Sequence, residues 1–121
     1  MLITEEISYS KLIQSLPRLK EFNVCYIADW SKVDSNYKYF SIRDESTDKL
    51  LGAFCLFFSK RKGMLHLSNP PFFQNCGLWI GIQGKNLYYQ NSHQKKVLKS
   101  LADFLGAYKW VNISFPPECI D

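Results

Sequence analysis

Aromatic and amide side chains gather in one short segment between two apolar runs of the chain. This segment, Asn69 to Gly77, places Phe72, Phe73 and Gln74 directly after two prolines. Proline fixes φ and removes a backbone donor, so the segment cannot continue a β-ladder and is expected to form a rigid loop. Such a loop can hold a substrate by stacking and by hydrogen bonds to the amide.

The candidate substrate-binding residues are therefore Phe72, Phe73 and Gln74 of this loop, together with Trp79 of the run that follows it. A different interpretation of the two phenylalanines stays open. Aromatic rings next to a strand end often plug the core of a sheet, and such rings contribute to stability rather than to binding.

The remaining reactive residues form no recognisable catalytic set. The chain has no serine-hydrolase, P-loop, dinucleotide-binding or HExxH signature. Its two histidines, His66 and His93, are expected at the surface or with satisfied hydrogen bonds. The four cysteines lack the spacing of zinc ligands, so no metal site is expected. The catalytic residues of any reaction therefore stay unknown from the sequence.

The composition indicates one folded domain. The chain has 121 residues, 46% hydrophobic and 16% aromatic, which is enough for one core and too apolar for disorder. Its net charge is +4, and the one basic cluster, Lys60-Arg61-Lys62, is interpreted as a solvated turn. Nucleic acid is an unfavoured partner, because no exposed aromatic residues are interleaved with the basic ones.

No membrane partner is expected. The N-terminal residues Met1 to Glu6 lack the apolar core of a signal peptide, and no apolar run is long enough to cross a bilayer. A cytoplasmic location with reduced thiols is the expectation that follows.

The first half of the chain predicts a helix and then an antiparallel meander. Apolar spacing predicts a helix over Ser8 to Leu16, and the stretch from Asn23 to Val33 fits either a short helix or an extended chain. Alternation and turn residues predict three strands, with Gly52 as a bulge or a close approach in the second. These strands are Tyr37–Arg43, Lys49–Ser59 and Met64–Ser68.

The second half predicts a strand, a long helix and a last strand. The strands are expected at Leu78–Ile82 and Trp110–Phe115, and the helix at Ser92–Leu105 with Asn91 and Gln94 as a capping box. The helix has one apolar face, made of Val97, Leu98, Leu101, Phe104 and Leu105. A helix that joins two strands predicts that they are parallel neighbours. The expected fold class is α+β, with a mixed, mostly antiparallel sheet and flanking helices.

This order of elements resembles the first half of a GNAT-type acyltransferase fold. Particular residues are similar to those of FemAB-like proteins of the Bacteroides group, in which a loop of two prolines and a phenylalanine followed by glutamine and glycine recurs. The segments that carry this resemblance are Asp29-Trp30, Tyr37 to Phe40, Leu51 to Phe54, Asn69 to Gln74 with Gly77, and Ile113 to Pro117.

The resemblance implies that residues 1–121 form a single GNAT-like domain, the N-terminal half of a longer two-half protein. It implies an acyl- or aminoacyl-transferase in which this half holds a small-molecule or peptide amine acceptor, while the second half binds the acyl-CoA or aminoacyl donor. The stretch Gln83 to Leu87, where GNAT enzymes hold the donor pyrophosphate, has one glycine. We therefore expect no cofactor and no activity in the isolated chain. The alternative is a non-catalytic ligand- or protein-binding module.

Overall fold

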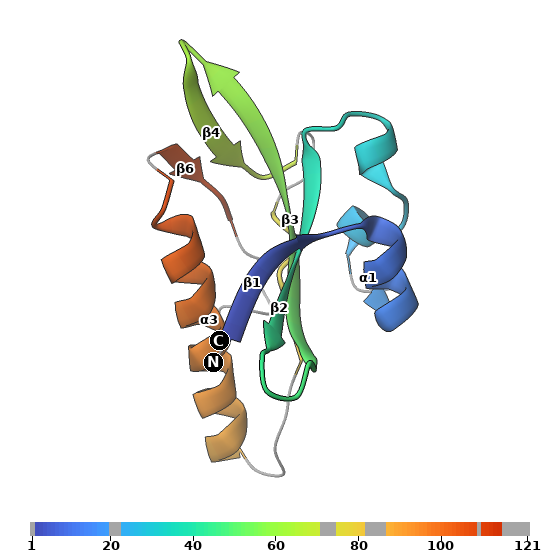
Figure 1. Cartoon of the computed structure of the whole chain (residues 1–121), viewed down its shortest axis with the longest axis vertical. Helices are drawn as coiled ribbons and strands as arrows, with labels where there is room; N and C mark the ends of the chain where they lie inside the picture. Colours follow the sequence, from blue (N-terminus) through green and yellow to red (C-terminus); the bar gives the residue numbers. More distant parts are fainter. Residues whose placement is uncertain (1, 20–22, 71–74, 82–86, 109, 115–121) are drawn as a thin grey trace.

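The chain forms one mixed β-sheet with helices on both faces (Figure 1). The computed structural model describes residues 2–19, 23–70, 75–81, 87–108 and 110–114. Five strands follow one another across the sheet and β5 pairs with β3, which confirms the predicted α+β class with a mixed, mostly antiparallel sheet. The strands are β1 (Leu2–Ile7), β2 (Tyr37–Asp44), β3 (Leu50–Arg61), β4 (Met64–Ser68), β5 (Trp79–Ile80) and β6 (Trp110–Asn112).

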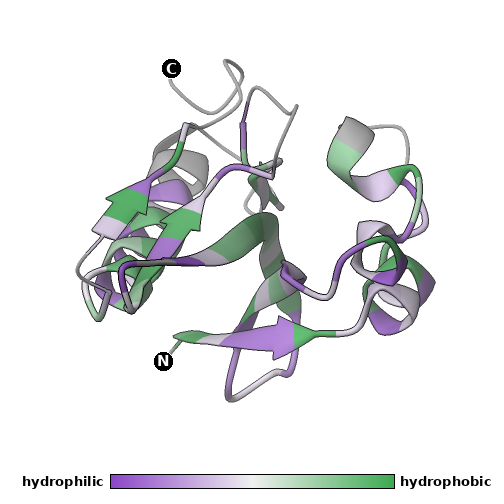
Figure 2. Cartoon of the chain, turned by 90° about the horizontal axis from the view of Figure 1, so that it is seen from above, coloured by the Kyte–Doolittle hydropathy of each residue, from purple (hydrophilic) through white to green (hydrophobic). Residues whose placement is uncertain are grey.

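The central strand β3 is buried on both faces over Leu51 to Leu56. One face carries Phe54 into a core that includes Val97 and Leu101 of helix α3 (Leu87–Leu105). The other face carries Cys55 into a second core with Leu12 of helix α1 (Tyr9–Ser15). Figure 2 shows hydrophobic residues concentrated along the middle of the sheet, between these two helices.

Side-chain caps begin helix α1 and the second of the 3-10 helices described below. The predicted helix near the N-terminus is confirmed as α1, and the Oγ of Ser8 accepts a hydrogen bond from the backbone of Lys11. The stretch from Asn23 to Val33, which the sequence predicted as either a short helix or an extended chain, contains two 3-10 helices, η1 (Val24–Tyr26) and η2 (Trp30–Lys32). Among the described residues, no helix has both the length and the apolar character that crossing a bilayer requires.

The predicted meander β2–β3–β4 is confirmed, and tight turns set its register. Lys62 and Gly63 both have positive φ, as a two-residue hairpin turn between β3 and β4 requires. Gly52 is a site of close approach, because an added Cβ would lie 3.1 Å from the carbonyl oxygen of Trp79. The β2–β3 ladder also shifts register beside it, between Ile42 and Arg43.

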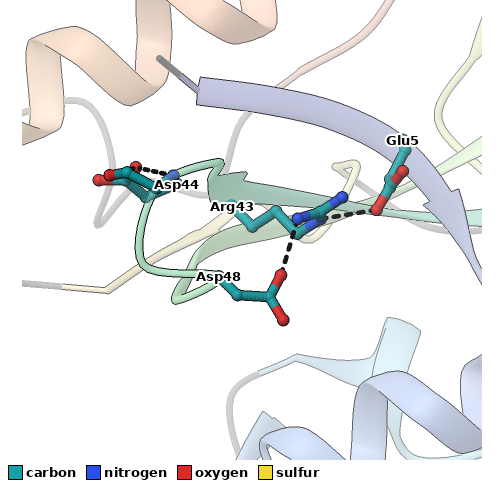
Figure 3. Close-up of polar contacts among 5 residues, drawn as sticks. Glu5, Arg43, Asp44 and Asp48 are labelled. Carbon is teal, nitrogen blue, oxygen red and sulfur yellow. Dashed lines mark hydrogen bonds and ion pairs between the residues drawn. The ribbon is translucent and has the colours of Figure 1, made fainter.

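Ion pairs join the sheet edge to the β2–β3 turn (Figure 3). Arg43 of β2 contacts Glu5 of β1 and Asp48 of the turn, each at 2.7 Å. In the same turn, Asp44 accepts hydrogen bonds from the backbone and the hydroxyl of Ser46. These groups are solvent-exposed, so we expect them to contribute little to stability.

Several features differ from the sequence expectations. No strand was predicted before the first helix, but β1 forms there and pairs antiparallel with β2. Helix α3 begins at Leu87, so Asn91 lies inside it and the predicted capping box is wrong. The predicted strand over Leu78–Ile82 is shorter, since β5 covers only Trp79 and Ile80.

The predicted parallel pairing is also wrong in its partner. The sequence led us to expect that the strands before and after α3 would be neighbours. β6 instead pairs parallel with β4, His66 lying beside Trp110, and β5 pairs antiparallel with β3. The reason is that β4 and β5 pair with different parts of the same side of β3. The far side of β4 is therefore available to β6.

The substitution Leu101→Ala is expected to lower the free energy of unfolding by about 2–5 kcal/mol, because it deletes a side chain that is 1% exposed in the core between α3 and the sheet. Chemical denaturation measures this loss. The exposed Lys99→Ala on the same helix serves as control and should change stability by less than about 0.5 kcal/mol. A loss below about 1 kcal/mol for Leu101→Ala would mean that this face of α3 is not packed as described.

Candidate functional site

The proline-containing loop interrupts what would otherwise be a single strand along one side of β3. Phe57 of β3 pairs with Ser68 of β4, so a regular antiparallel ladder would set residue 72 opposite Ala53. Trp79 occupies that place instead. Seven extra residues therefore separate the two segments that pair with this side of β3, and they belong to the loop that the sequence singled out.

Ser114 holds both described ends of the loop through its backbone. Its N–H donates to the Oδ1 of Asn69 at 2.9 Å, and its carbonyl oxygen accepts from the N–H of Cys76 at 3.0 Å. Ser114 follows β6, whose ladder with β4 ends at Ser68 and Asn112. The loop thus leaves and re-enters the sheet beside the point where β4 and β6 stop pairing.

A second set of contacts holds the returning end of the loop against η1. The Oδ1 of Asn75 accepts from the Nδ2 of Asn23 at 3.0 Å and from the N–H of Gly77 at 2.9 Å. The hydroxyl of the buried Tyr26 donates to the carbonyl oxygen of Gly77. These bonds satisfy polar groups that would otherwise be buried unpaired, so they hold the loop end in one position.

Gly77 is required at this point for two reasons. Its φ is +66°, in the left-handed region that residues with a Cβ rarely adopt. An added Cβ would also lie 3.0 Å from the Sγ of Cys25.

Three thiols lie behind the loop, but burial makes them inert. Cys25, Cys55 and Cys76 are free and fully buried. Burial and, secondarily, the neighbouring Cys76 raise the pKa of Cys25 to about 12. Burial likewise raises the pKa of Cys55 and of Tyr26 well above their usual ranges. Because the thiolate is the nucleophile, Cys25 and Cys55 stay protonated and act as packing residues.

The residues predicted to bind substrate are only partly described. Phe72, Phe73 and Gln74 lie outside the described residues, so their predicted role stays a prediction. Trp79 lies in β5, partly buried against the core that contains Leu12 and Tyr39. Its ring covers Gly81, where an added Cβ would lie 2.9 Å from the ring. At least part of the Trp79 side chain therefore has a packing role in the core and not a binding role.

The polar residues that hold the loop were missed by the sequence analysis. Asn23, Asn75 and Ser114 are distant in the chain, and no short spacing connects them. The asparagines beside the prolines were the available signal, since Asn commonly bonds to backbone groups in turns. Within the described ranges, no group of three or more His, Cys, Asp and Glu side chains comes together as a metal site.

What this arrangement offers chemically, within the described residues, is a loop held at both ends beside a strand edge with no described partner strand. β5 pairs with β3 on one side, and no described strand pairs with its other edge. An unpaired edge presents backbone donors and acceptors that can bind an extended amide-containing ligand. A substrate held there would contact the loop at one end.

The fold is similar to that of solved acetyltransferases. The ribosomal-protein-alanine N-acetyltransferase of Brucella melitensis biovar Abortus 2308 matches with a TM-score of 0.55 and 11% identity, over 97% of this chain and 80% of that chain. An acetyltransferase of Trypanosoma brucei matches with a TM-score of 0.47 and 13% identity, over 98% and 85%. No protein-family model and no curated protein matches the sequence. The first similarity confirms the predicted GNAT-like fold, and at this identity it concerns the fold alone.

A matched pair of glycine variants tests how tightly the loop end is packed. Gly77→Ala and Gly63→Ala both place Ala at positive φ, which costs roughly 1–2 kcal/mol. Only Gly77→Ala also brings a Cβ against Cys25, since nothing lies within 4 Å of the Cβ at Gly63. We expect thermal or chemical unfolding to show a clearly larger loss for Gly77→Ala. Equal losses would show that the loop end is free to move away from Cys25.

Proposed function

We propose that this chain is the substrate-side domain of an acyl- or aminoacyl-transferase with a GNAT fold. The observation that carries the proposal is the fold, which matches an acetyltransferase over nearly the whole of this chain. The candidate site supports it, because the anchored loop adjoins an open strand edge of the same sheet.

The reaction class follows from the chemistry of the described residues. The buried thiols are protonated, so a covalent acyl-enzyme on cysteine is disfavoured. Transfer would be direct: the acceptor amine attacks the donor carbonyl, a C–N bond forms, and the thioester or ester bond breaks. The departing thiolate or alkoxide takes up the proton that the amine loses and leaves as a thiol or alcohol. The contribution of this domain is proximity, since holding the amine in place supplies much of the rate. Phe72, Phe73, Gln74 and Trp79 are the residues we assign to that task.

The donor site belongs to a second GNAT-like half in this proposal, as in FemAB-like proteins. Acyl-CoA or an aminoacyl donor would bind there, and a small-molecule or peptide amine would bind here. A cytoplasmic location fits the three described cysteines, which are free thiols.

A non-catalytic ligand- or protein-binding module is the second candidate. One observation favours it: among the described residues, the resolved pKa shifts of the thiols and phenols are all upward, away from neutrality. General bases are normally tuned toward the working pH. Transfer activity of the two-half protein decides between the two functions.

The isolated chain should not bind coenzyme A tightly, because Gln83 to Leu87 lacks a glycine-rich turn for the pyrophosphate. Isothermal titration calorimetry with coenzyme A is the measurement. Micromolar binding, about −8 kcal/mol or stronger, would contradict the two-half proposal and indicate a stand-alone acetyltransferase.

The substitution Gln74→Ala tests the loop in the longer two-half protein. If Gln74 contacts the acceptor, turnover should fall by about tenfold or more with the melting temperature nearly unchanged, because one positioning interaction of about 1.4 kcal/mol is lost. Gln14→Ala on α1, at an exposed site, is the matched control and should leave both quantities unchanged. A structural Gln74 would give the reverse, with a large drop in melting temperature and activity falling only with the folded fraction.

A further inference from the structure

Among the described residues, no helix covers the sheet face opposite α3 at its β3–β4–β6 end. The helical segments on that face pack over Tyr39, Ala53 and Cys55, toward the middle of the sheet. The β3–β4 hairpin extends past both helices, at the top of Figure 1. A cleft of about 150 Å³ lies at this end, between strands β3, β4 and β6.

The strand register brings five side chains together in this cleft. His66 pairs with Ser59 across β3 and with Trp110 across β6, and Ser68 pairs with Asn112. Cross-strand partners share a face of the sheet, as do residues two apart in one strand. All five therefore lie on the face of the sheet opposite α3, while the intervening Leu67 is buried in the core against α3.

The polar side chains of the cleft have unused hydrogen-bonding capacity. In the described part of the chain, no hydrogen bond involves the side chains of Ser59, His66 or Asn112. Ser68 donates to the carbonyl oxygen of Asn69 at 3.2 Å and can still accept. Together these groups offer several donors and acceptors toward one small volume.

An aromatic surface lies beside these groups. The rings of Trp110 and His66 stack with centroids 5.5 Å apart and an interplanar angle of 16°. Trp110 is 44% exposed, whereas most tryptophan side chains in folded proteins are largely buried. An exposed indole fixed by stacking on its strand neighbour presents a rigid apolar surface to a ligand.

The lining restricts the chemistry of the ligand. The described lining residues include no Asp, Glu, Lys or Arg, so the cleft has no fixed charge to hold a phosphate, a carboxylate or an ammonium group. Its volume is below the roughly 300–1,000 Å³ of drug-sized pockets, which leaves room for one ring. A neutral ring with an apolar face and several hydroxyl groups fits the indole and the free donors and acceptors at once.

We propose that this cleft binds one pyranose ring of a neutral saccharide. The apolar face of the sugar lies on the indole of Trp110, and its hydroxyl groups bond to Ser59, His66 and Asn112. The inference does not depend on acyl transfer, because binding is measured without any donor.

NMR titration with methyl glycosides of glucose, galactose, mannose and N-acetylglucosamine tests this proposal. We expect at least one glycoside to shift the indole N–H resonance of Trp110, with a dissociation constant of about 1 mM. Trp110→Ala should weaken binding by about tenfold or more, because the apolar surface is lost. Asn112→Ala should weaken it by roughly threefold to tenfold, the effect of one hydrogen bond.

Met64→Ala is the control, since Met64 is exposed on β4 and does not line the cleft. It should leave the affinity unchanged. If Trp110→Ala does not fold, Trp110→Phe and Asn112→Ala provide the same comparison. The proposal is overturned if no glycoside at about 50 mM shifts the Trp110 resonance. It is also overturned if Trp110→Ala and Asn112→Ala bind the glycoside as tightly as the unsubstituted chain, with binding to these variants followed by the backbone amide resonances of β4. Tighter binding of uridine than of every glycoside would also overturn it, because the ring that stacks on the indole of Trp110 would then be a nucleobase and not a sugar.

Discussion

The burial of β3 on both faces is the constraint on which the rest of the structure depends. From Leu51 to Leu56 every residue of the strand is buried, so apolar cover is needed on each side of the sheet. α3 supplies it on one side, and α1 with the 3-10 helices supplies it on the other. Gly52 lets β5 and α3 approach the strand closely, because an added Cβ would lie 3.1 Å from the Trp79 backbone and 3.3 Å from Val97. The layers of the fold follow from this one strand.

The same strand determines where the candidate site can form. β3 is long enough to pair with β4 at one end and with β5 at the other, so the residues between them can leave the edge without breaking the sheet. The departing and returning ends are then held by Ser114, Asn23 and Tyr26. The thiols behind the loop are packing residues, so any chemistry at this edge rests with the loop side chains and with the ligand.

The cleft between β3, β4 and β6 lies close to the ends of the proline-containing loop. The β3–β4 hairpin extends beyond the helices, and the cleft lined by His66 and Trp110 lies at this end of the sheet. Asn112 lines that cleft, and Ser114, two residues later, holds the loop. A ligand in the cleft would therefore lie beside the proposed acceptor loop, and the short segment after β6 would connect the two.

The sequence by itself determined the elements whose signals are local. The helix after Ser8, the turn between β3 and β4 and the stripe through Val97 and Leu101 follow from turn chemistry and periodicity, which neighbouring residues define. The loop was located by its prolines, while the roles of Phe72, Phe73 and Gln74 stay predictions. Tertiary structure alone decided that β1 joins the edge, that β6 pairs with β4, and that His66 meets Trp110. These are pairings between distant segments, and their register depends on which surfaces the packed core leaves available, which no local pattern encodes.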